Sequence, residues 1–191
     1  MLMSTEPLSG YRPGDDLVMT NVIFQHRSGE QAVAILEDIT STYIDAHSGN
    51  PDEDHELFGR STFISRTESQ ARKRGFELVA ATSGGALVGF SFGYPFAAGQ
   101  WWADCTLPAR EVLDASKFAV IELDVRRDFQ RQGIGKKLLE SLLSGRTEEF
   151  ATLAATTESA AHAMYIRWGW HKVGVFETPP VMDAMLIAMQ S

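Results

Sequence analysis

Apolar residues recur along the chain with two periods, one of two residues, typical of strands, and one of three to four, typical of amphipathic helices. The first period, together with short apolar runs, predicts strands at residues 18–26, 76–81, 86–95, 118–125, 150–155, 171–177 and 184–189. The second predicts helices from a cap at Ser28 to about residue 44, over 61–74, from the glycines at 133 and 135 to about residue 145, and over 159–168. Strands and helices are interleaved, so the pattern predicts an α/β or α+β fold with helices on both faces of one sheet.

The segment 123–143 joins a predicted strand to a predicted helix through a turn that contains Gly133 and Gly135. Glycine has no β-carbon, so the backbone can bend sharply and a ligand can approach its N–H groups closely. The first turn of the helix leaves further N–H groups unpaired and carries a partial positive charge. Five basic residues and one acid lie between Arg126 and Lys137, although the whole chain has a net charge of −8. The segment therefore predicts a binding site for a phosphate or pyrophosphate.

The spacing of the two glycines separates this turn from other phosphate-binding loops. P-loops and dinucleotide-binding turns need the patterns G-x-x-x-x-G-K-[ST] and G-x-G-x-x-G, and neither fits. The pattern Gln130-x-x-Gly133-x-Gly135, after a strand that ends in LDV, resembles the acetyl-coenzyme A motif of the GNAT superfamily of N-acetyltransferases. The order of predicted elements from residue 18 to the C-terminus is also similar to the GNAT fold. The resemblance implies a mixed, mostly antiparallel sheet of six to seven strands flanked by helices. In it the strands at 118–125 and 150–155 run parallel and splay apart to form a coenzyme cleft.

The resemblance also implies which residues bind acetyl-coenzyme A (acetyl-CoA). Backbone groups at the strand end would bind the pantetheine amides and the thioester carbonyl, and the turn would hold the pyrophosphate. Many family members have an asparagine at the position of Glu158, so a side-chain contact there departs from the family pattern. Arg127, Arg131 or Lys137 could reach the 3′-phosphate. The expected coenzyme-binding residues are Leu123, Asp124, Val125, Gln130, Arg131, Gln132, Gly133, Ile134, Gly135, Lys136, Glu158, Ser159 and Tyr165.

Tyr165 is the expected proton donor. The sequence of residues 161–170 fits the family pattern A-x-x-x-Y-x-x-x-G-[FW]. The resemblance implies that the tyrosine hydroxyl protonates the departing thiolate, a step for which a phenol is a suitable acid. The alternative is that Tyr165 only packs and forms a hydrogen bond.

Glu122 is the expected base. Glu122 and Asp124 alternate with Ile121, Leu123 and Val125, so both carboxylates should leave the strand on one face and the apolar residues on the other. If that face borders the cleft, Glu122 could accept the proton of the attacking amine, helped by a pKa raised through burial. The alternative is that both acids pair with arginines or are solvated.

Three aromatic residues are candidates for binding the acceptor. Tyr94, Trp101 and Trp102 stand where the family often places walls of the acceptor site. The alternative is that the tryptophans cover the core at the end of the sheet. His162 could line the cleft or lie on the helix surface. The loops at 45–59 and 97–114, which would select the acceptor, follow no known motif.

The composition limits the remaining possibilities. A chain of 191 residues with 44% hydrophobic residues predicts one domain at 18–191, after a flexible arm at 1–17. No apolar stretch reaches the roughly 18 residues of a membrane helix and no signal-peptide pattern begins the chain, which predicts a cytoplasmic protein without a membrane partner. The single cysteine, Cys105, excludes an intramolecular disulfide, and the five histidines lack metal-ligand spacing, so no metal is expected. The negative net charge argues against nucleic acid and suits a cationic amine.

These features predict a GNAT-type N-acetyltransferase. The enzyme would transfer an acetyl group directly from acetyl-CoA to a primary amine of a small molecule or peptide. The alternatives are a non-catalytic acyl-CoA binding or sensing module, and an acyltransferase that acts on a protein N-terminus or a lysine. The length of the acyl group and a homodimeric state stay open.

Overall fold

A computed structural model of the chain describes residues 21–49, 59–157 and 159–189. The predicted arm at 1–17 and the start of the first predicted strand lie outside these residues. The centre of the molecule is a seven-stranded sheet in the order β1-β2-β3-β4-β5-β7-β6. Its strands are β1 (Ile23–Arg27), β2 (Glu77–Ser83), β3 (Ala86–Phe96), β4 (Lys117–Val125), β5 (Phe150–Thr156), β6 (His171–Phe176) and β7 (Met182–Ala188). Within the described residues, no helix is both long and apolar enough to cross a membrane.

The helices follow the predicted order with two differences. They are α1 (Gly29–Ala34), α2 (Leu36–His47), α3 (Arg60–Ala71), α4 (Arg110–Asp114), α5 (Ile134–Leu143) and α6 (Ala160–Arg167), with a 3₁₀ turn η2 (Arg127–Phe129) before α5. The single helix predicted after Ser28 is interrupted at Ile35, a β-branched residue whose φ of −117° and ψ of 25° leave the helical region. The short helix α4 lies in a connection for which no helix was predicted.

Two local predictions are confirmed. The Ser28 hydroxyl caps α1 by accepting from the Gln31 N–H, and the Gln31 side chain accepts in return from the Ser28 N–H. Between β2 and β3, Gly84 and Gly85 both have positive φ, at 58° and 84°. A tight hairpin turn requires such angles, which glycine adopts at no steric cost.

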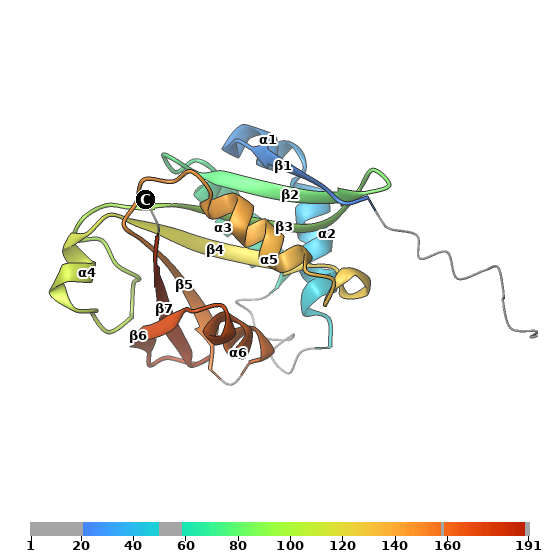
Figure 1. Ribbon diagram of the computed structural model, residues 1–191. Helices are drawn as coiled ribbons and strands as arrows, with labels where there is room; N and C mark the ends of the chain where they lie inside the picture. Colours follow the sequence, from blue (N-terminus) through green and yellow to red (C-terminus); the bar gives the residue numbers. More distant parts are fainter. Residues whose placement is uncertain (1–20, 50–58, 158, 190–191) are drawn as a thin grey trace, which may run out of the picture.

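The strands β4 and β5 form the parallel pair that the family resemblance implies. They pair only over three residues, Lys117 to Ala119 against Phe150 to Thr152. Every other neighbouring pair in the sheet is antiparallel. Beyond Ala119 the two strands separate, and in Figure 1 β5 and its neighbours β7 and β6 descend away from β4. The separation leaves one edge of β4 without a partner strand over its C-terminal half.

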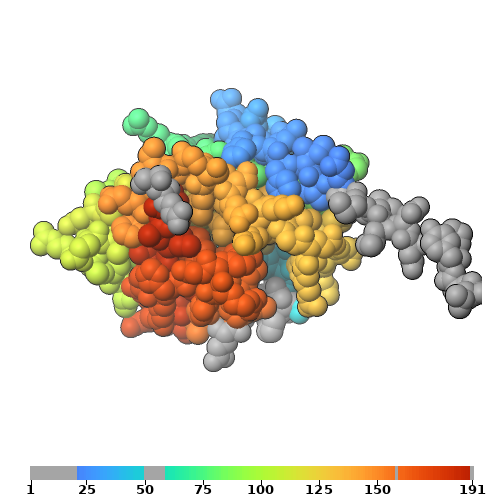
Figure 2. Space-filling view, in the orientation of Figure 1, coloured from blue at the N-terminus to red at the C-terminus, as the bar shows by residue number. Residues whose placement is uncertain are grey.

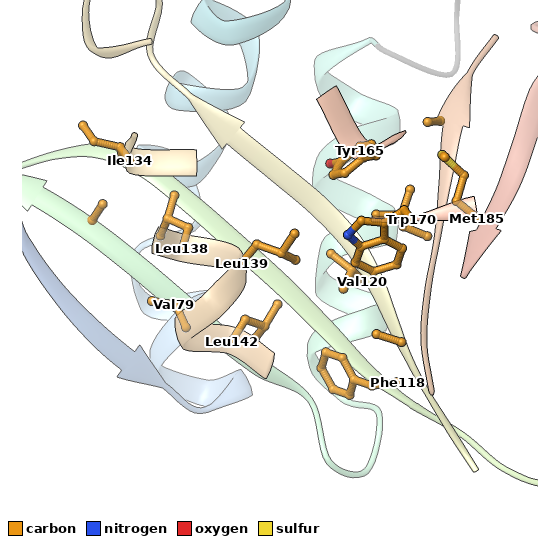
Figure 3. Close-up of a cluster of buried hydrophobic side chains, with 14 of the residues drawn as sticks. Val79, Phe118, Val120, Ile134, Leu138, Leu139, Leu142, Tyr165, Trp170 and Met185 are labelled. Carbon is orange, nitrogen blue, oxygen red and sulfur yellow. The ribbon is translucent and has the colours of Figure 1, made fainter. Parts of the chain in front are cut away.

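Apolar side chains form two cores, one on each face of the sheet. The first core lies between the sheet and the helices α5 and α6, and Figure 3 shows Leu138 and Leu142 of α5 on one side and Tyr165 and Trp170 on the other. The second core lies under α2 and α3, which Figure 1 shows behind the sheet. Its members include Ile39, Tyr43, Phe63, Phe90 and Phe92.

A bulge at Ile121 decides which way the residues of β4 face. In the pairing with β3, Phe92 opposes Glu122 and Gly93 opposes Val120, so Ile121 is an extra residue. A β-carbon on Gly93 would lie 2.1 Å from the Ala119 carbonyl oxygen, so the close approach of β3 at this point requires glycine.

The bulge corrects one expectation from the sequence. Ile121 does not face away from the acids but packs against the second core, on the same side as Glu122. Leu123 and Val125 pack against the first core, as alternation predicts. A strand in strict alternation would have placed Glu122 in phase with Val120, a member of the first core. Because the bulge absorbs one residue, both carboxylates face the side of α2 and α3.

Candidate active site

The turn between β4 and α5 has the backbone of an anion-binding loop. Gly133 caps α5 with a φ of 80°, in the left-handed region that favours glycine, and Arg131 also has a positive φ of 60°. Among the described residues, the N–H groups of residues 131–136 have no hydrogen-bond partner, and the first that donates is that of Lys137, to the Gly133 carbonyl at 3.1 Å. Figure 2 shows this part of the chain, in yellow to light orange, on the molecular surface. Unpaired N–H groups at a helix start provide donors for a phosphate.

Within the described residues, packing gives no reason for the absence of a side chain at Gly135. Of their atoms, a β-carbon there would have one neighbour within 4 Å, Val125 Cγ2 at 3.7 Å, which is an ordinary contact. The protein itself would therefore accept alanine at this position. A glycine in the first turn of α5 keeps the approach to the N–H groups open.

Contacts from β4, β3 and α2 hold the turn in place. The Gln130 amide donates to the Val125 carbonyl at 2.9 Å, and the Arg127 N–H donates to Asp45 Oδ2 at 2.9 Å. The Arg126 guanidinium donates to the Leu87 carbonyl at 2.8 Å and to the Ser41 hydroxyl at 3.1 Å. The C-terminal part of α2 thus fixes the backbone at the start of the loop between β4 and α5.

A cleft of about 190 Å³ opens where β4 and β5 separate. Both strands contribute backbone and side chains, and α2 and α6 close its sides. Its lining residues are His47, Val120, Ile121, Glu122, Leu123, Asp124, Leu153, Ala154, Ala155, Thr156, Ser159, Ala161 and Tyr165. The cleft therefore brings Tyr165 together with Glu122 and Asp124, which the sequence had placed in a separate segment.

Glu122 forms an ion pair with Arg66 of α3 inside this cleft. Burial raises the pKa of Glu122 to about 7, against the opposing charge of Arg66 and with a further upward contribution from Asp124. The guanidinium also contacts Tyr43 and Phe63, at 5.6 and 5.3 Å from their ring centroids. A carboxyl group with a pKa near neutrality can gain and lose a proton at physiological pH.

Asp124 is paired with His47 at the C-terminus of α2. Asp124 Oδ1 accepts from His47 Nε2 at 3.1 Å, and only 6% of the Asp124 side chain is exposed. Burial lowers the pKa of His47, but the hydrogen bond to Asp124 and the negative charge of both carboxylates outweigh it and raise that pKa above its ordinary value. The imidazole also packs against the Tyr43 ring, at 4.4 Å between ring centroids and with the two planes tilted by 37°.

His47, Glu122 and Asp124 form a cluster that sequence spacing had not revealed. A ring nitrogen of His47 and one oxygen of each carboxylate all lie within 4.8 Å of one another. Such a set could hold a cation, whether an ammonium group or a metal ion. Because its members come from α2 and β4, 75 residues or more apart in the chain, no local motif marks them.

Tyr165 lies on the opposite side of the cleft, in α6. It is 7% exposed and packs edge-on against Trp168 and Trp170, each 5.9 Å away between ring centroids. Burial raises the pKa of the Tyr165 phenol above its ordinary value, and the negative charges of Asp124 and Glu122 raise it further. The hydroxyl therefore keeps its proton at physiological pH.

The other predicted site residues lie in different environments. Ser159 lines the cleft and caps α6 by accepting from the His162 N–H at 3.0 Å, whereas Glu158 lies outside the described residues. His162 forms an ion pair with Asp183 at 2.9 Å and is not among the lining residues of the cleft.

The structure does not bring the three predicted acceptor-binding aromatics into this cleft. The Trp102 indole donates to the Thr152 hydroxyl at 3.0 Å and packs edge-on against Phe96 and Phe176, and the Trp101 indole donates to the Thr106 carbonyl at 3.1 Å. Tyr94 packs against the second core. Trp102 thus covers apolar side chains at the far end of β3.

Comparisons with known proteins identify the fold. The chain is 14% identical to the PaiA N-acetyltransferase of Thermoplasma acidophilum, solved in complex with coenzyme A; the match covers 88% of this chain and 99% of that chain, with a TM-score of 0.60. Ard1 of Thermoplasma volcanium is 15% identical over 89% of this chain and 99% of that chain, with a TM-score of 0.60. The ribosomal-protein-S18-alanine N-acetyltransferase of Escherichia coli is 18% identical over 88% and 96%, with a TM-score of 0.56. At these identities the solved structures show a shared fold. No curated protein matches the sequence.

The fold is thus that of the acetyltransferases. The family model of the GNAT acetyltransferase domain matches residues 74–172, just over half of the chain. The match spans the turn between β4 and α5, both strands of the cleft and Tyr165. The chain belongs to the GNAT acetyltransferase family, whose members transfer an acetyl group from acetyl-CoA, and the resemblance predicted from its motifs is confirmed.

Proposed function

We propose that the protein is an N-acetyltransferase that transfers the acetyl group of acetyl-CoA directly to a primary amine of a small molecule or peptide. The observation that carries the proposal is the cleft between β4 and β5. It has a carboxyl group with a pKa of about 7 on one side and a protonated phenol on the other. Direct transfer to an amine needs a base and an acid in these two states.

The described residues fit coenzyme A at two places. The unpaired N–H groups of residues 131–136 suit a pyrophosphate, and the unpartnered edge of β4 after Ala119 suits the amides of a pantetheine arm. Gly135 supports the first assignment, because no contact with another part of the described chain requires a glycine there. Bound in this way, acetyl-CoA supplies an activated acyl group.

Glu122 acts as the base in this proposal. An amine must lose its proton before its lone pair can attack a thioester carbonyl. Glu122 in its ionised form accepts that proton, and its raised pKa makes the transfer less unfavourable than it would be to an ordinary carboxylate. Arg66 keeps the ionised form accessible, since its positive charge opposes the effect of burial.

Tyr165 acts as the acid, and the two proton transfers assist each other. The negative charge of Glu122 is one of the causes that hold the pKa of Tyr165 high. Once Glu122 has accepted a proton, this charge is gone and Tyr165 becomes a stronger acid. The phenol then donates its proton to the departing thiolate, and it recovers a proton from the attacking nitrogen, which must lose its second proton to become an amide.

The test is release of coenzyme A from acetyl-CoA with a panel of primary amines. The panel contains n-alkylamines, diamines, an amino-acid amide, and peptides with a free N-terminus or a lysine. We expect release that depends on one or more of these amines, with a stoichiometric N-acetyl product detected by mass spectrometry. Binding of acetyl-CoA without release for any amine would instead favour a non-catalytic binding or sensing module, and product on the peptides alone would favour a protein acetyltransferase.

A further inference from the structure

The two carboxylates of the cleft differ in how completely their oxygens are satisfied. Glu122 is engaged by the Arg66 guanidinium. Asp124 uses Oδ1 to accept from His47, but its Oδ2 is buried and has no hydrogen-bond partner among the described residues. A buried carboxylate oxygen without a donor is unfavourable, because it has lost water and gained nothing in return. A ligand that brings an N–H group into the cleft would remove this penalty.

The separation of the two carboxylates suits one ammonium group. An ammonium nitrogen directs its N–H bonds at tetrahedral angles, so two hydrogen bonds of about 2.9 Å would end on oxygens roughly 4.7 Å apart. An oxygen of Glu122 and an oxygen of Asp124 lie no farther apart than 4.8 Å, so both carboxylates are within reach of one substrate nitrogen.

The charged groups around the cleft favour an ammonium ion over a divalent metal. The positively charged guanidinium of Arg66, from α3, already lies beside the Glu122 carboxylate, and His47 from α2 donates a hydrogen bond to Asp124. Among the described residues, the other titratable groups that act on the carboxylates are Tyr43 and Tyr165, neutral phenols with raised pKa values. A single positive charge on a hydrogen-bond donor completes this set with less repulsion from Arg66 than a double charge would meet.

We propose that Asp124, held by His47, is the residue that binds the ammonium group of the acceptor and presents it to Glu122. Asp124 selects a cationic amine and orients its nitrogen. Glu122 takes the proton, and the nitrogen lone pair is then free for attack. His47 is a positioning residue that acts through Oδ1 of Asp124. This assignment rests on the proposed function and adds to it the residue that recognises the acceptor.

The test compares Asp124→Asn with Glu122→Gln, using the panel amine that the wild-type enzyme acetylates fastest. Asparagine keeps the shape and can still accept from His47, but it has no negative charge and would turn an N–H group towards the substrate. We expect Asp124→Asn to raise the KM for the amine about tenfold or more while the KM for acetyl-CoA changes less than twofold. Glu122→Gln should mainly lower kcat.

The His47 variants test the positioning role. His47→Gln retains a donor near the position of Nε2, whereas His47→Ala removes it. We expect His47→Ala to raise the KM for the amine several-fold and His47→Gln to restore most of the loss. These two variants also decide the matter if Asp124→Asn does not fold, as judged by circular dichroism and coenzyme A affinity.

Several outcomes would overturn the assignment. An unchanged amine KM in folded Asp124→Asn would exclude recognition by Asp124, and a rise confined to acetyl-CoA would assign Oδ2 to a coenzyme N–H. Equal effects of His47→Ala and His47→Gln would reduce His47 to a packing role. Loss of activity with EDTA and its return with Zn²⁺ would assign the cluster to a metal ion. A wild-type enzyme that binds coenzyme A but acetylates no amine would contradict the proposed function itself, which distinguishes that failure from the others.

Discussion

The turn between β4 and α5 and the charged side of the cleft both begin at β4, but they depend on different parts of the polypeptide. The turn is formed by consecutive residues, 126–136, and its donors are backbone N–H groups. The charged side is formed by side chains from three elements, with His47 from α2, Arg66 from α3 and two carboxylates from β4. In the proposed reaction, backbone shape would govern coenzyme binding, whereas side-chain charge would govern the chemistry. Substitutions in the two regions should change different kinetic constants.

Tyr165→Phe should give the largest effect, on the chemical step alone. The substitution removes the hydroxyl and keeps the ring that packs against Trp168 and Trp170. We expect kcat to fall about 10²-fold or more, the scale of a lost proton donor, with unchanged affinity for coenzyme A. Steady-state kinetics and calorimetric titration of coenzyme A measure the two quantities. An effect on the KM for acetyl-CoA alone would assign Tyr165 to binding and remove the proposed acid.

Gly135→Val should instead weaken the binding of coenzyme A. The new side chain has space on the protein side, so the fold should be retained, but it would obstruct the approach to the N–H groups at the start of α5. We expect the affinity for coenzyme A to fall about tenfold or more. Glu140→Val, on the exposed side of the same helix, provides the control for the lower helix propensity of valine. Equal coenzyme affinity in the two variants would place the pyrophosphate elsewhere.

Arg66→Met should alter the pH dependence of the reaction. Glu122 must be ionised to act as a base, so kcat/KM for the amine should rise with pH through the pKa of Glu122, which is about 7. Arg66 lowers that pKa, and its removal should therefore move the rising limb of the profile to higher pH, by about one unit. Arg60→Met, which removes the exposed ion pair between α3 and Glu37, should leave the limb in place. An unchanged pH profile would show that Arg66 does not influence the group whose ionisation controls the rate.

Two cap substitutions should give the smallest effects. Ser28 caps α1 and Ser159 caps α6, each through a hydrogen bond from its hydroxyl oxygen to a backbone N–H group. Replacing either serine by alanine should cost about 1 kcal/mol of unfolding free energy, measured in urea. Only Ser159→Ala should also lower kcat, because α6 carries Tyr165. Equal kinetics in the two variants would show that the end of α6 tolerates fraying without effect on the reaction.

The sequence predicted the fold more completely than the site, for physical reasons. Hydrophobic periodicity and glycine turns are local signals, so the order of elements and the hairpin at Gly84 and Gly85 could be inferred from short segments. The splayed pair and Tyr165 came from resemblance to a family. The partners of the carboxylates could not be predicted, because His47 and Arg66 are far from β4 in the chain and only the packing of α2 and α3 on the sheet brings them near.

Aromatic residues gave the least reliable signal. Adjacent tryptophans in a loop are compatible with a ligand wall and with a covered core, and the sequence offers no means of choosing between them. The structure pairs the Trp102 indole with Thr152 and surrounds it with Phe96 and Phe176. Whether such a side chain is buried depends on tertiary packing, and neither the hydrophobic periodicity nor the spacing of motifs in the sequence reveals that packing.

The bulge at Ile121 gives β4 a tolerance to changes in chain length. The extra residue divides β4 into two halves. The first half ends at Val120, which faces the first core, and the second half carries the two carboxylates. Loss of Ile121 would straighten the strand, yet Glu122 and Asp124 would stay opposite Phe92 and Phe90 and keep their present face. Deletion of Ile121 can therefore occur without turning the carboxylates into the core, whereas deletion of Leu123 would reverse Asp124.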